Sequence, residues 1–273
     1  MTIHRTLHRF AAAAALATAL GAASVSGAFA QGAAESRPGP SGQVVKAGRQ
    51  LEDGGWHGDG LSLDAAENKK VDDFLTHAQR AEQSISPEMR AVAQVSHATL
   101  IGFDQRLKSA DSLKRKVATS LKATPGQTVD GALAKINDSI RYTLEWPDGR
   151  YTKGVTAASS MLSSWGNDSA KWSNTWGTQK GYKGINSAWR DLGSGHVFEV
   201  QFHTPSSKWA QEVTHKLYEE QRLPSTPAER AKELQEQQDA IFASVPVPEG
   251  AEGLAAPATR RPVGGPQTLP AAA

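Results

Sequence analysis

The apolar residues of this chain follow two different periods. In several stretches they recur every three or four residues, the spacing of an amphipathic α-helix. Helices are therefore expected from residues 64 and 86 onward and over residues 104–121, 151–165, 205–222 and 226–243. Ser86 is expected to cap the second helix, with Pro87 in the first turn, where a missing N–H is tolerated.

Strict alternation of polar and apolar residues, the period of a β-strand, appears in the second half of the chain. Strands are expected over residues 138–146, 171–176, 182–192 and 196–204. The turn Gly193-Ser194-Gly195 joins the last two into a hairpin. This order of elements predicts an α/β (α+β) fold with a small mixed, mainly antiparallel sheet flanked by helices.

The second strand of the hairpin separates its side chains by polarity. Its apolar residues are expected in the core, and Glu199, Gln201 and His203 on the opposite face. A surface strand would show the same alternation. Pairing through the turn, however, places Asn186 opposite Gln201 and Gly184 near His203. That pairing predicts a polar floor with one spot free of side chains.

Tyr182 precedes this floor and is expected at its mouth. An aromatic ring there could stack on a nucleotide base. Stacking needs only the ring, so the Tyr182 hydroxyl is expected to be dispensable.

Cationic residues recur four apart in the helix expected over residues 104–121. Lys108, Ser112 and Lys116 would form one stripe, with Arg106 less than a turn away. Such a stripe can receive an extended polyphosphate. A basic helical face can equally be a solvated surface.

Two acidic residues complete the candidate chemistry. Asp138 stands at the start of the first expected strand and Glu199 lies on the hairpin. Phosphoryl or pyrophosphoryl transfer requires carboxylates that hold Mg²⁺ against phosphate oxygens. The two acids are the natural pair for this role, although an aspartate at a strand start can also be a cap.

Taken in chain order, these motifs resemble the synthetase domain of RelA/SpoT-type alarmone synthetases. The resemblance spans about residues 106–222. A leader peptide on a free-standing synthetase further resembles the extracellular ATP nucleotide 3′-pyrophosphokinases of actinomycetes. The motifs are Arg106-x-Lys108-x-x-x-Ser112-x-x-x-Lys116, Asp138, Tyr182-Lys-Gly184-Ile-Asn186-Ser and Glu199-Val-Gln201-Phe-His203-Thr.

The resemblance implies a nucleotidyltransferase-like synthetase fold. It also implies transfer of the β,γ-pyrophosphate of ATP to the 3′-hydroxyl of a purine nucleotide, with Mg²⁺ as cofactor. Asp138 and Glu199 would hold Mg²⁺ and act in catalysis, and Glu199 would also help deprotonate the acceptor hydroxyl. The residues implied to grip the ATP phosphates are Arg106, Lys108, Ser112 and Lys116.

The acceptor side is implied by the remaining motifs. Tyr182 would stack on the acceptor base, beside Gly184, Asn186, Gln201 and His203. The sequence departs from the family here, because His203 replaces an arginine and Trp189 a histidine. The strict guanine preference of the family is therefore not expected.

A further departure concerns the residues after Asp138. Arg141 follows Asp138 by three positions, whereas the family spaces this pair by five. Both spacings would place Asp138 and Arg141 on opposite faces of a strand.

The ends of the chain differ in composition from residues 64–245, the expected pyrophosphokinase domain. Residues 1–30 have the pattern of a cleaved signal peptide, which predicts a secreted protein, with a retained anchor as the alternative. A flexible linker or arm is expected over residues 31–63, and a disordered tail over residues 246–273.

Charge and cysteine content narrow the function classes. The net charge of +2 falls to zero once the leader's Arg5 and Arg9 are removed, which argues against nucleic acid as a partner. No membrane contact is expected after cleavage, and the absence of cysteine excludes disulfides. The alternatives to an enzyme are a nucleotide-binding module or toxin-related protein without turnover, and a polyanion-binding protein.

Overall fold

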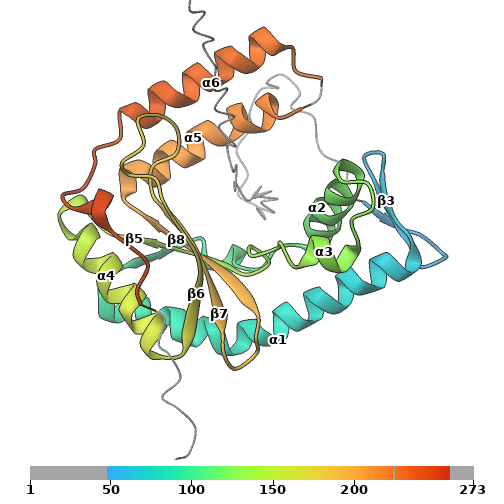
Figure 1. Cartoon of the computed structure of the whole chain (residues 1–273), viewed down its shortest axis with the longest axis horizontal. Coiled ribbons are helices and arrows are strands. Elements are labelled where there is room, and N and C mark those ends of the chain that lie inside the picture. The colour runs from blue at the N-terminus through green and yellow to red at the C-terminus, as the bar shows by residue number, and fades with distance from the viewer. Residues whose placement is uncertain (1–47, 224, 259–273) are drawn as a thin grey trace, which may run out of the picture. The chain divides into compact units, whose positions relative to one another are not determined.

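The computed structural model describes residues 48–223 and 225–258. A five-stranded sheet with the order β4-β5-β8-β7-β6 lies at its centre (Figure 1). β5 and β8 run parallel, and the other neighbours are antiparallel. The mixed, mainly antiparallel sheet flanked by helices confirms the predicted fold class. The strands are β4 (Thr99–Ile101), β5 (Arg141–Glu145), β6 (Asn167–Asn174), β7 (Ile185–Asp191) and β8 (Val197–His203).

Helices lie on both sides of this sheet, with α5 and α6 opposite α1 and α4 (Figure 1). The helices are α1 (Ala65–Ser96), α2 (Ala110–Ala123), α3 (Val129–Leu133), α4 (Asp148–Ser164), α5 (Pro205–Gln221) and α6 (Ala228–Ala243). Within the described residues, none is long and apolar enough to cross a bilayer. The predicted hairpin and the last three helices are confirmed within a few residues.

α1 is one continuous helix, so the prediction of a second helix capped by Ser86 is wrong. Pro87 lies inside α1. Ile85 and Met89, on either side of Pro87, are both fully buried in the core. Packing of this continuous apolar face sustains the helix although proline removes one backbone hydrogen bond. The Ser86 hydroxyl instead lies 2.8 Å from the hydroxyl of Tyr142 on β5.

The third predicted helix begins later than expected. α2 starts at Ala110, because the Ser109 hydroxyl accepts a hydrogen bond from the Ser112 N–H and caps it. Residues Phe103–Gln105 form a separate 3₁₀ turn. Arg106 and Lys108 therefore precede α2, and the expected helical stripe does not exist as such.

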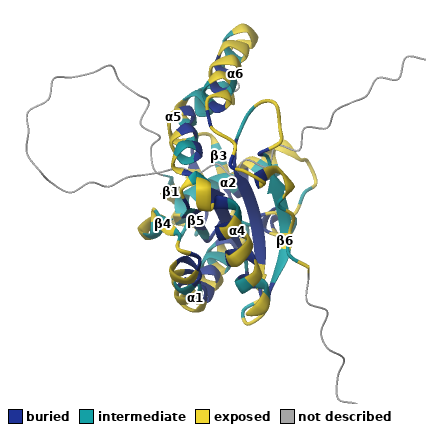
Figure 2. Ribbon diagram, turned by 90° about the vertical axis from the view of Figure 1, so that its left-hand side faces the viewer, coloured by how far each residue is buried: buried dark blue, intermediate teal, exposed yellow. Residues whose placement is uncertain are grey.

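The main core lies between the apolar face of the sheet and the helices α1 and α4. Phe198, Val200 and Phe202 of β8 are fully buried in it. Figure 2 shows the central strands as buried and the outward sides of the helices as exposed. Because side chains alternate along a strand, Glu199, Gln201 and His203 lie on the other face, as predicted.

A second, smaller core forms where a flexible linker was predicted. Its sheet has the order β1-β2-β3 and packs beside α2 and α3. Trp56 and Leu63 are almost fully buried there. The linker prediction is wrong for residues 48–63, because these two side chains give the short strands an apolar face to bury. The strands are β1 (Arg49–Gln50), β2 (Trp56–Gly58) and β3 (Leu61–Leu63).

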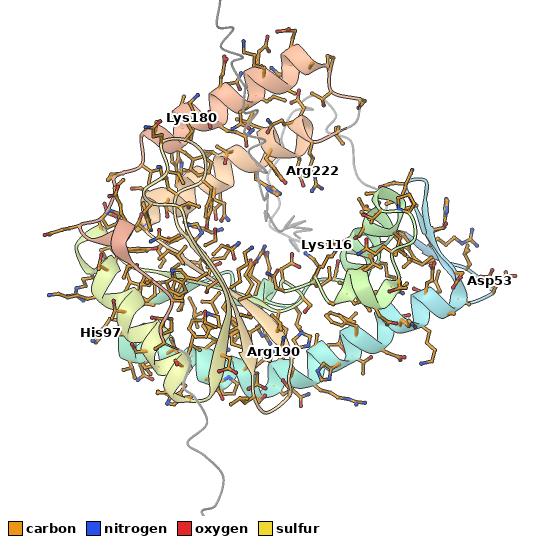
Figure 3. All side chains as sticks on the ribbon, in the orientation of Figure 1. Asp53, His97, Lys116, Lys180, Arg190 and Arg222 are labelled. Carbon is orange, nitrogen blue, oxygen red and sulfur yellow. The ribbon has the colours of Figure 1, made fainter. Side chains whose placement is uncertain are left out.

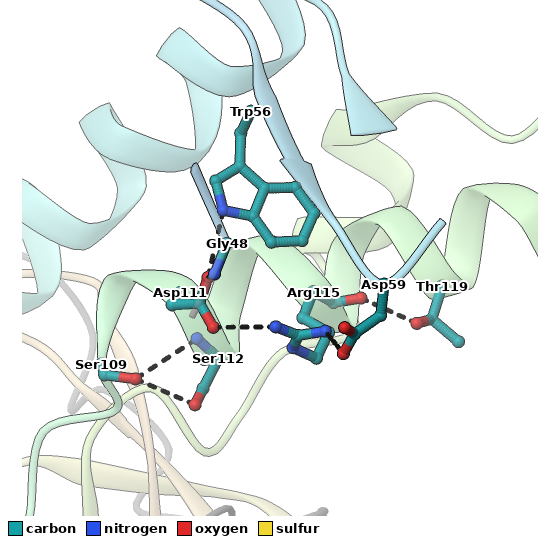
Figure 4. A network of polar contacts seen from close by, with 8 residues as sticks. All are labelled: Gly48, Trp56, Asp59, Ser109, Asp111, Ser112, Arg115 and Thr119. Carbon is teal, nitrogen blue, oxygen red and sulfur yellow. Dashed lines mark hydrogen bonds and ion pairs between the residues drawn. The ribbon is translucent and has the colours of Figure 1, made fainter. Parts of the chain in front are cut away.

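Polar contacts attach this small sheet to α2 (Figure 4). Asp111 accepts hydrogen bonds from the Gly48 N–H at 2.6 Å and from the Trp56 indole at 3.1 Å. Arg115 pairs with Asp111 at 3.1 Å and also with Asp59. Most of these bonds join segments more than fifty residues apart, which local sequence patterns do not reveal.

The tail prediction is also wrong for residues 246–258. Ala251 is fully buried and belongs to the main core. The Asn174 side-chain amide donates to the carbonyls of Ala251 and Leu254 at 2.8 and 3.0 Å. This segment therefore packs along β6. The predicted signal peptide, the first part of the linker and residues 259–273 lie outside the described residues.

Candidate active site

The polar face of β5, β8 and β7 carries the candidate site. Asn186 pairs with Gln201, the register predicted from the hairpin turn. In the parallel pair, Arg141 lies opposite Glu199 and Glu145 opposite His203. α5 contributes to this face, since the Gln211 amide lies 3.4 Å from the Gln201 side-chain oxygen. Successive residues on this face are about 7 Å apart.

Charged groups converge at the Glu199 end of this face. The buried Asp138 carboxylate pairs with Lys108 Nζ at 3.1 Å and with Lys116 Nζ at 2.8 Å. Figure 3 shows Lys116 on the side of α2 turned toward the sheet. Burial raises the pKa of Asp138, but the two lysine charges outweigh it and hold that pKa below its ordinary value. Asp138 is therefore ionised at neutral pH.

Glu199 lies beside this ion pair under different electrostatic conditions. It is almost completely buried, and the Gln201 amide donates to its Oε1 at 2.9 Å. Burial and then the negative charge of Asp138 raise the pKa of Glu199, against the opposing charges of Arg141 and Lys116. A carboxylate with a raised pKa takes up a proton more readily, as a general base must.

Arg141 also belongs to this end of the face. Its charge acts on Glu199 together with that of Asp138. The expectation that Asp138 and Arg141 occupy opposite strand faces is therefore wrong. Asp138 precedes β5, where the alternation of a strand does not apply.

Two of the four predicted phosphate-binding residues do not share this arrangement. Arg106 pairs with Glu82 of α1 and donates to Ser86 at 3.0 Å, and its guanidinium stacks over Phe103. Ser112 sits in the first turn of α2, with its hydroxyl 2.9 Å from that of Ser109 (Figure 4). Lys108 and Lys116 are brought together, whereas the Arg106 guanidinium lies among residues of α1. The ATP-binding roles of all four stay predictions.

At the His203 end, the histidine ring is hydrogen-bonded only to neutral groups among the described residues. His203 is fully buried, with Nδ1 2.9 Å from the Ser207 hydroxyl and Nε2 2.9 Å from the Tyr182 hydroxyl. The Ser207 hydroxyl donates to the Thr204 carbonyl. His203 Nδ1 therefore donates to Ser207, and Nε2 accepts from Tyr182. Burial lowers the pKa of His203 to about 3, with Lys208 and Arg141 adding to the effect.

Gly184 and Tyr182 are closer together than the sequence suggested. A Cβ added at Gly184 would lie 2.9 Å from the Tyr182 hydroxyl. Tyr182 itself therefore covers the spot expected to be free of side chains. Its half-buried ring packs edge-on against Phe242 of α6 and against His203. The prediction that this ring stacks on a base stays open, whereas its hydroxyl has a defined partner.

One acceptor on this face has no protein partner. Asn186 Oδ1 is buried without a hydrogen bond to any residue that the structure describes. A buried carbonyl oxygen without a partner costs free energy, which a ligand donor would recover. Asn186 was predicted to contact the acceptor nucleotide.

Sequence reasoning missed the contributions of Thr143, Glu145 and Lys208 to this face. The Thr143 hydroxyl lies 3.5 Å from the Gln201 side chain, and Lys208 electrostatically influences both Glu145 and His203. Alternation along β5 could have identified the first two. Lys208 depends on how α5 packs over the sheet.

The two carboxylates fit a magnesium ion in chemical type. Mg²⁺ is usually held by one or two protein carboxylates, with phosphate oxygens and water completing its shell. Asp138 and Glu199 supply two such groups, and the repulsion between them is what a divalent cation would relieve. The described residues contain no cluster of three or more His, Asp or Glu side chains suited to a metal.

No protein-family model and no curated protein matches this sequence. Among solved structures, the chain is similar to the small alarmone synthetase 1 from Bacillus subtilis bound to its product pppGpp. That match has 13% identity and a TM-score of 0.45, and covers 63% of this chain and 91% of the other. A GTP pyrophosphokinase family protein from Streptococcus pneumoniae matches at 15% identity and a TM-score of 0.46, covering 63% and 87%.

Both proteins belong to the group that the sequence motifs resemble. With TM-scores below 0.5, these likenesses carry no argument about the activity of this chain. A function for the protein has to rest on its own side chains.

Proposed function

We propose that this protein transfers the β,γ-pyrophosphate of ATP to the 3′-hydroxyl of a purine nucleotide. The observation that carries the proposal is the meeting of two buried carboxylates with two lysines. Asp138 pairs with Lys108 and Lys116, and its charge raises the pKa of Glu199. A site for binding alone has no need of two buried acids beside its cations, because they weaken phosphate binding.

In the proposed reaction Glu199 takes the proton of the acceptor 3′-hydroxyl. The acceptor oxygen forms a bond to the β-phosphorus of ATP. The bond from that phosphorus to the oxygen shared with the α-phosphate breaks, and AMP leaves with the electron pair. Lys108 and Lys116 bind the ATP phosphates and offset the charge that develops on them.

Asp138 and Glu199 would hold Mg²⁺ at this place. Bound there, the ion supplies positive charge that neutralises phosphate oxygens. Asp138 keeps its charge because both lysines lower its pKa.

We further propose that the acceptor lies along the face from Glu199 toward His203. Asn186 Oδ1 and the Gln201 amide offer hydrogen bonds to its polar edge, and the Tyr182 ring lies at the far end. His203 is neutral, so its ring offers no positive charge to read a base edge. Adenine and guanine nucleotides are both expected to react. Export through the leader peptide is a separate proposal from sequence.

The decisive experiment incubates purified protein with ATP, Mg²⁺ and AMP, ADP, ATP, GDP or GTP in turn. Separation of the products should show AMP together with a 3′-pyrophosphorylated nucleotide. ATP labelled at the γ-phosphate should carry its label into the new product. Asp130→Asn, which removes an exposed carboxylate, should leave the rate unchanged. Release of free phosphate or pyrophosphate, with no labelled nucleotide, would contradict transfer.

A further inference from the structure

Arg141 is a half-buried cation on the polar face that has no direct partner. Its side chain makes no hydrogen bond or ion pair with any residue that the structure describes. The lysines that border the face each have an acidic partner. Lys108 and Lys116 pair with Asp138, and Lys208 pairs with Glu212. Removing an arginine from water without a fixed partner costs free energy.

Arg141 lies beside the carboxylate proposed as the general base. It begins β5, directly opposite Glu199 in the parallel register. Its charge acts on Lys108 at one end of the face and on His203, Tyr182 and Lys208 at the other. Arg141 therefore lies at the Glu199 end, and its charge also reaches the groups at the end assigned to the acceptor.

The groups around Arg141 define what it can bind. Glu199 is the nearest acid on its own face in register, but the two form no ion pair. Lys108 and Lys208 both lie near enough for their positive charges to repel that of Arg141. Like charges held around one place favour an anion between them, and a planar guanidinium suits the paired oxygens of a phosphate.

From this placement we propose that Arg141 binds the pyrophosphoryl group while it passes from donor to acceptor. This inference rests on the proposed function, since it assigns a residue to the group transferred there. Arg141 stabilises charge on the phosphate oxygens next to the bond that Glu199 helps to form. Lys108 and Lys116 hold the same phosphates from the α2 side.

Binding of inorganic pyrophosphate in Mg²⁺ buffer tests the inference without requiring turnover. Calorimetry should give an affinity for Arg141→Met that is about ten- to a hundredfold weaker than that of the unaltered protein. Arg141→Lys should recover part of this loss, because it keeps the charge but not the fork. The matched control is Arg190→Met, which removes an exposed arginine from β7 of the same sheet. Equal affinities of Arg141→Met and the control would overturn the inference.

Kinetic measurements then distinguish direct binding of the pyrophosphoryl group by Arg141 from an indirect effect of Arg141 on the pKa of Glu199. The kcat of Arg141→Met should fall about 10²–10³-fold, as for other groups that stabilise developing charge. Removing Arg141 also raises the pKa of Glu199. If that were the whole effect, kcat would return to normal at higher pH, and the inference would fail. We expect the loss to persist across the pH profile.

A thermal unfolding curve tests whether Arg141→Met weakens pyrophosphate binding only because it destabilises the fold. Arg141→Met removes an unpaired, half-buried charge, so its Tm should be unchanged or higher. A fall in Tm together with weaker pyrophosphate binding would assign Arg141 to the fold and overturn the inference. If the unaltered protein binds pyrophosphate through Arg141 but makes no transfer product, the proposed function fails and the anion site stands.

Discussion

The two ends of the polar face of β8 have nearly equal burial and opposite chemistry. Glu199 is 2% exposed and His203 is fully buried, yet only four positions separate them. Around Glu199 lie a second carboxylate, two lysines and an arginine. Around His203 runs a chain of neutral groups from Tyr182 to Ser207 in which both ring nitrogens have a partner.

This contrast separates the groups suited to a reaction, at the Glu199 end, from the groups that stabilise the fold, at the His203 end. Two acids held together in the core repel each other, which folding alone does not favour. The charged end therefore stores an unfavourable interaction that a bound ligand would relieve. The neutral chain is satisfied without a ligand, and such networks stabilise one arrangement of the core.

Asp138→Asn should have the largest effect. Lys108, with a side chain only 7% exposed, would lose the negative charge of Asp138 with which it pairs. Removing one partner of a buried pair costs about 3–5 kcal/mol of unfolding free energy, and transfer should also be lost. Urea unfolding gives the stability. Asp130→Asn, which breaks an exposed pair with Lys70, is the control and should cost about 1 kcal/mol or less. Similar losses of unfolding free energy in both variants would show that water screens the Asp138 ion pairs as it screens an exposed pair.

Glu199→Gln should abolish activity without harming the fold. Loss of the general base should lower kcat about 10²–10⁴-fold. The amide oxygen can still accept from Gln201, and the repulsion from Asp138 disappears. The Tm should therefore stay the same or rise, in contrast to Asp138→Asn. A marked drop in Tm would place Glu199 among the stabilising residues instead.

Acid should destabilise the protein first through two buried histidines, one of which is His203 at the neutral end. His203 has a pKa of about 3 and His196 of about 4, both lowered from 6.5 by burial. A histidine with a depressed folded-state pKa contributes its full stability above pH 6.5 and loses it as the pH falls toward the folded pKa. Each should cost roughly 2 kcal/mol between pH 7 and pH 5.

Denaturation curves at several pH values measure this slope. His203→Gln keeps a hydrogen-bonding side chain but does not titrate, so about half of the slope should remain. A slope unchanged by His203→Gln would mean that folding does not shift the pKa of this histidine.

Tyr182→Phe should have the smallest of these effects, although not a silent one. The substitution removes the Tyr182 hydroxyl, which is the hydrogen-bond donor to His203 Nε2. Because Tyr182 is half-buried, we expect a cost of about 1 kcal/mol, at the lower end for an unsatisfied group. Tyr218→Phe on α5 is the control, since the Tyr218 hydroxyl makes no hydrogen bond with any described residue. Equal Tm values for the two variants would show that the Tyr182 hydroxyl is dispensable.

Sequence patterns predicted the elements whose determinants are local. The alternation of β8 and the tight turn after β7 fix both the buried face and the pairing of Asn186 with Gln201. Helices α4, α5 and α6 follow from their period. The continuity of α1 through Pro87 was not predictable from local rules, because packing of Ile85 and Met89 overrides the proline.

The candidate site was predicted by residue type more than by geometry. Lys108 and Lys116 do converge, although through a loop and a helix instead of one helical stripe. The pairing of Arg106 with Glu82 of α1 joins segments that share no local pattern. The small sheet formed by β1, β2 and β3 escaped prediction because its strands are two or three residues long.

The packing of residues 246–258 along β6 sets the moment at which this chain can become fully folded during synthesis. Ala251 fills the main core, and Asn174 and Trp172 both donate hydrogen bonds to the Leu254 carbonyl. A nascent chain that ends before residue 245 has already made β6 but lacks the segment that covers it. Completion of the core must therefore wait until residues 246–258 have left the ribosome.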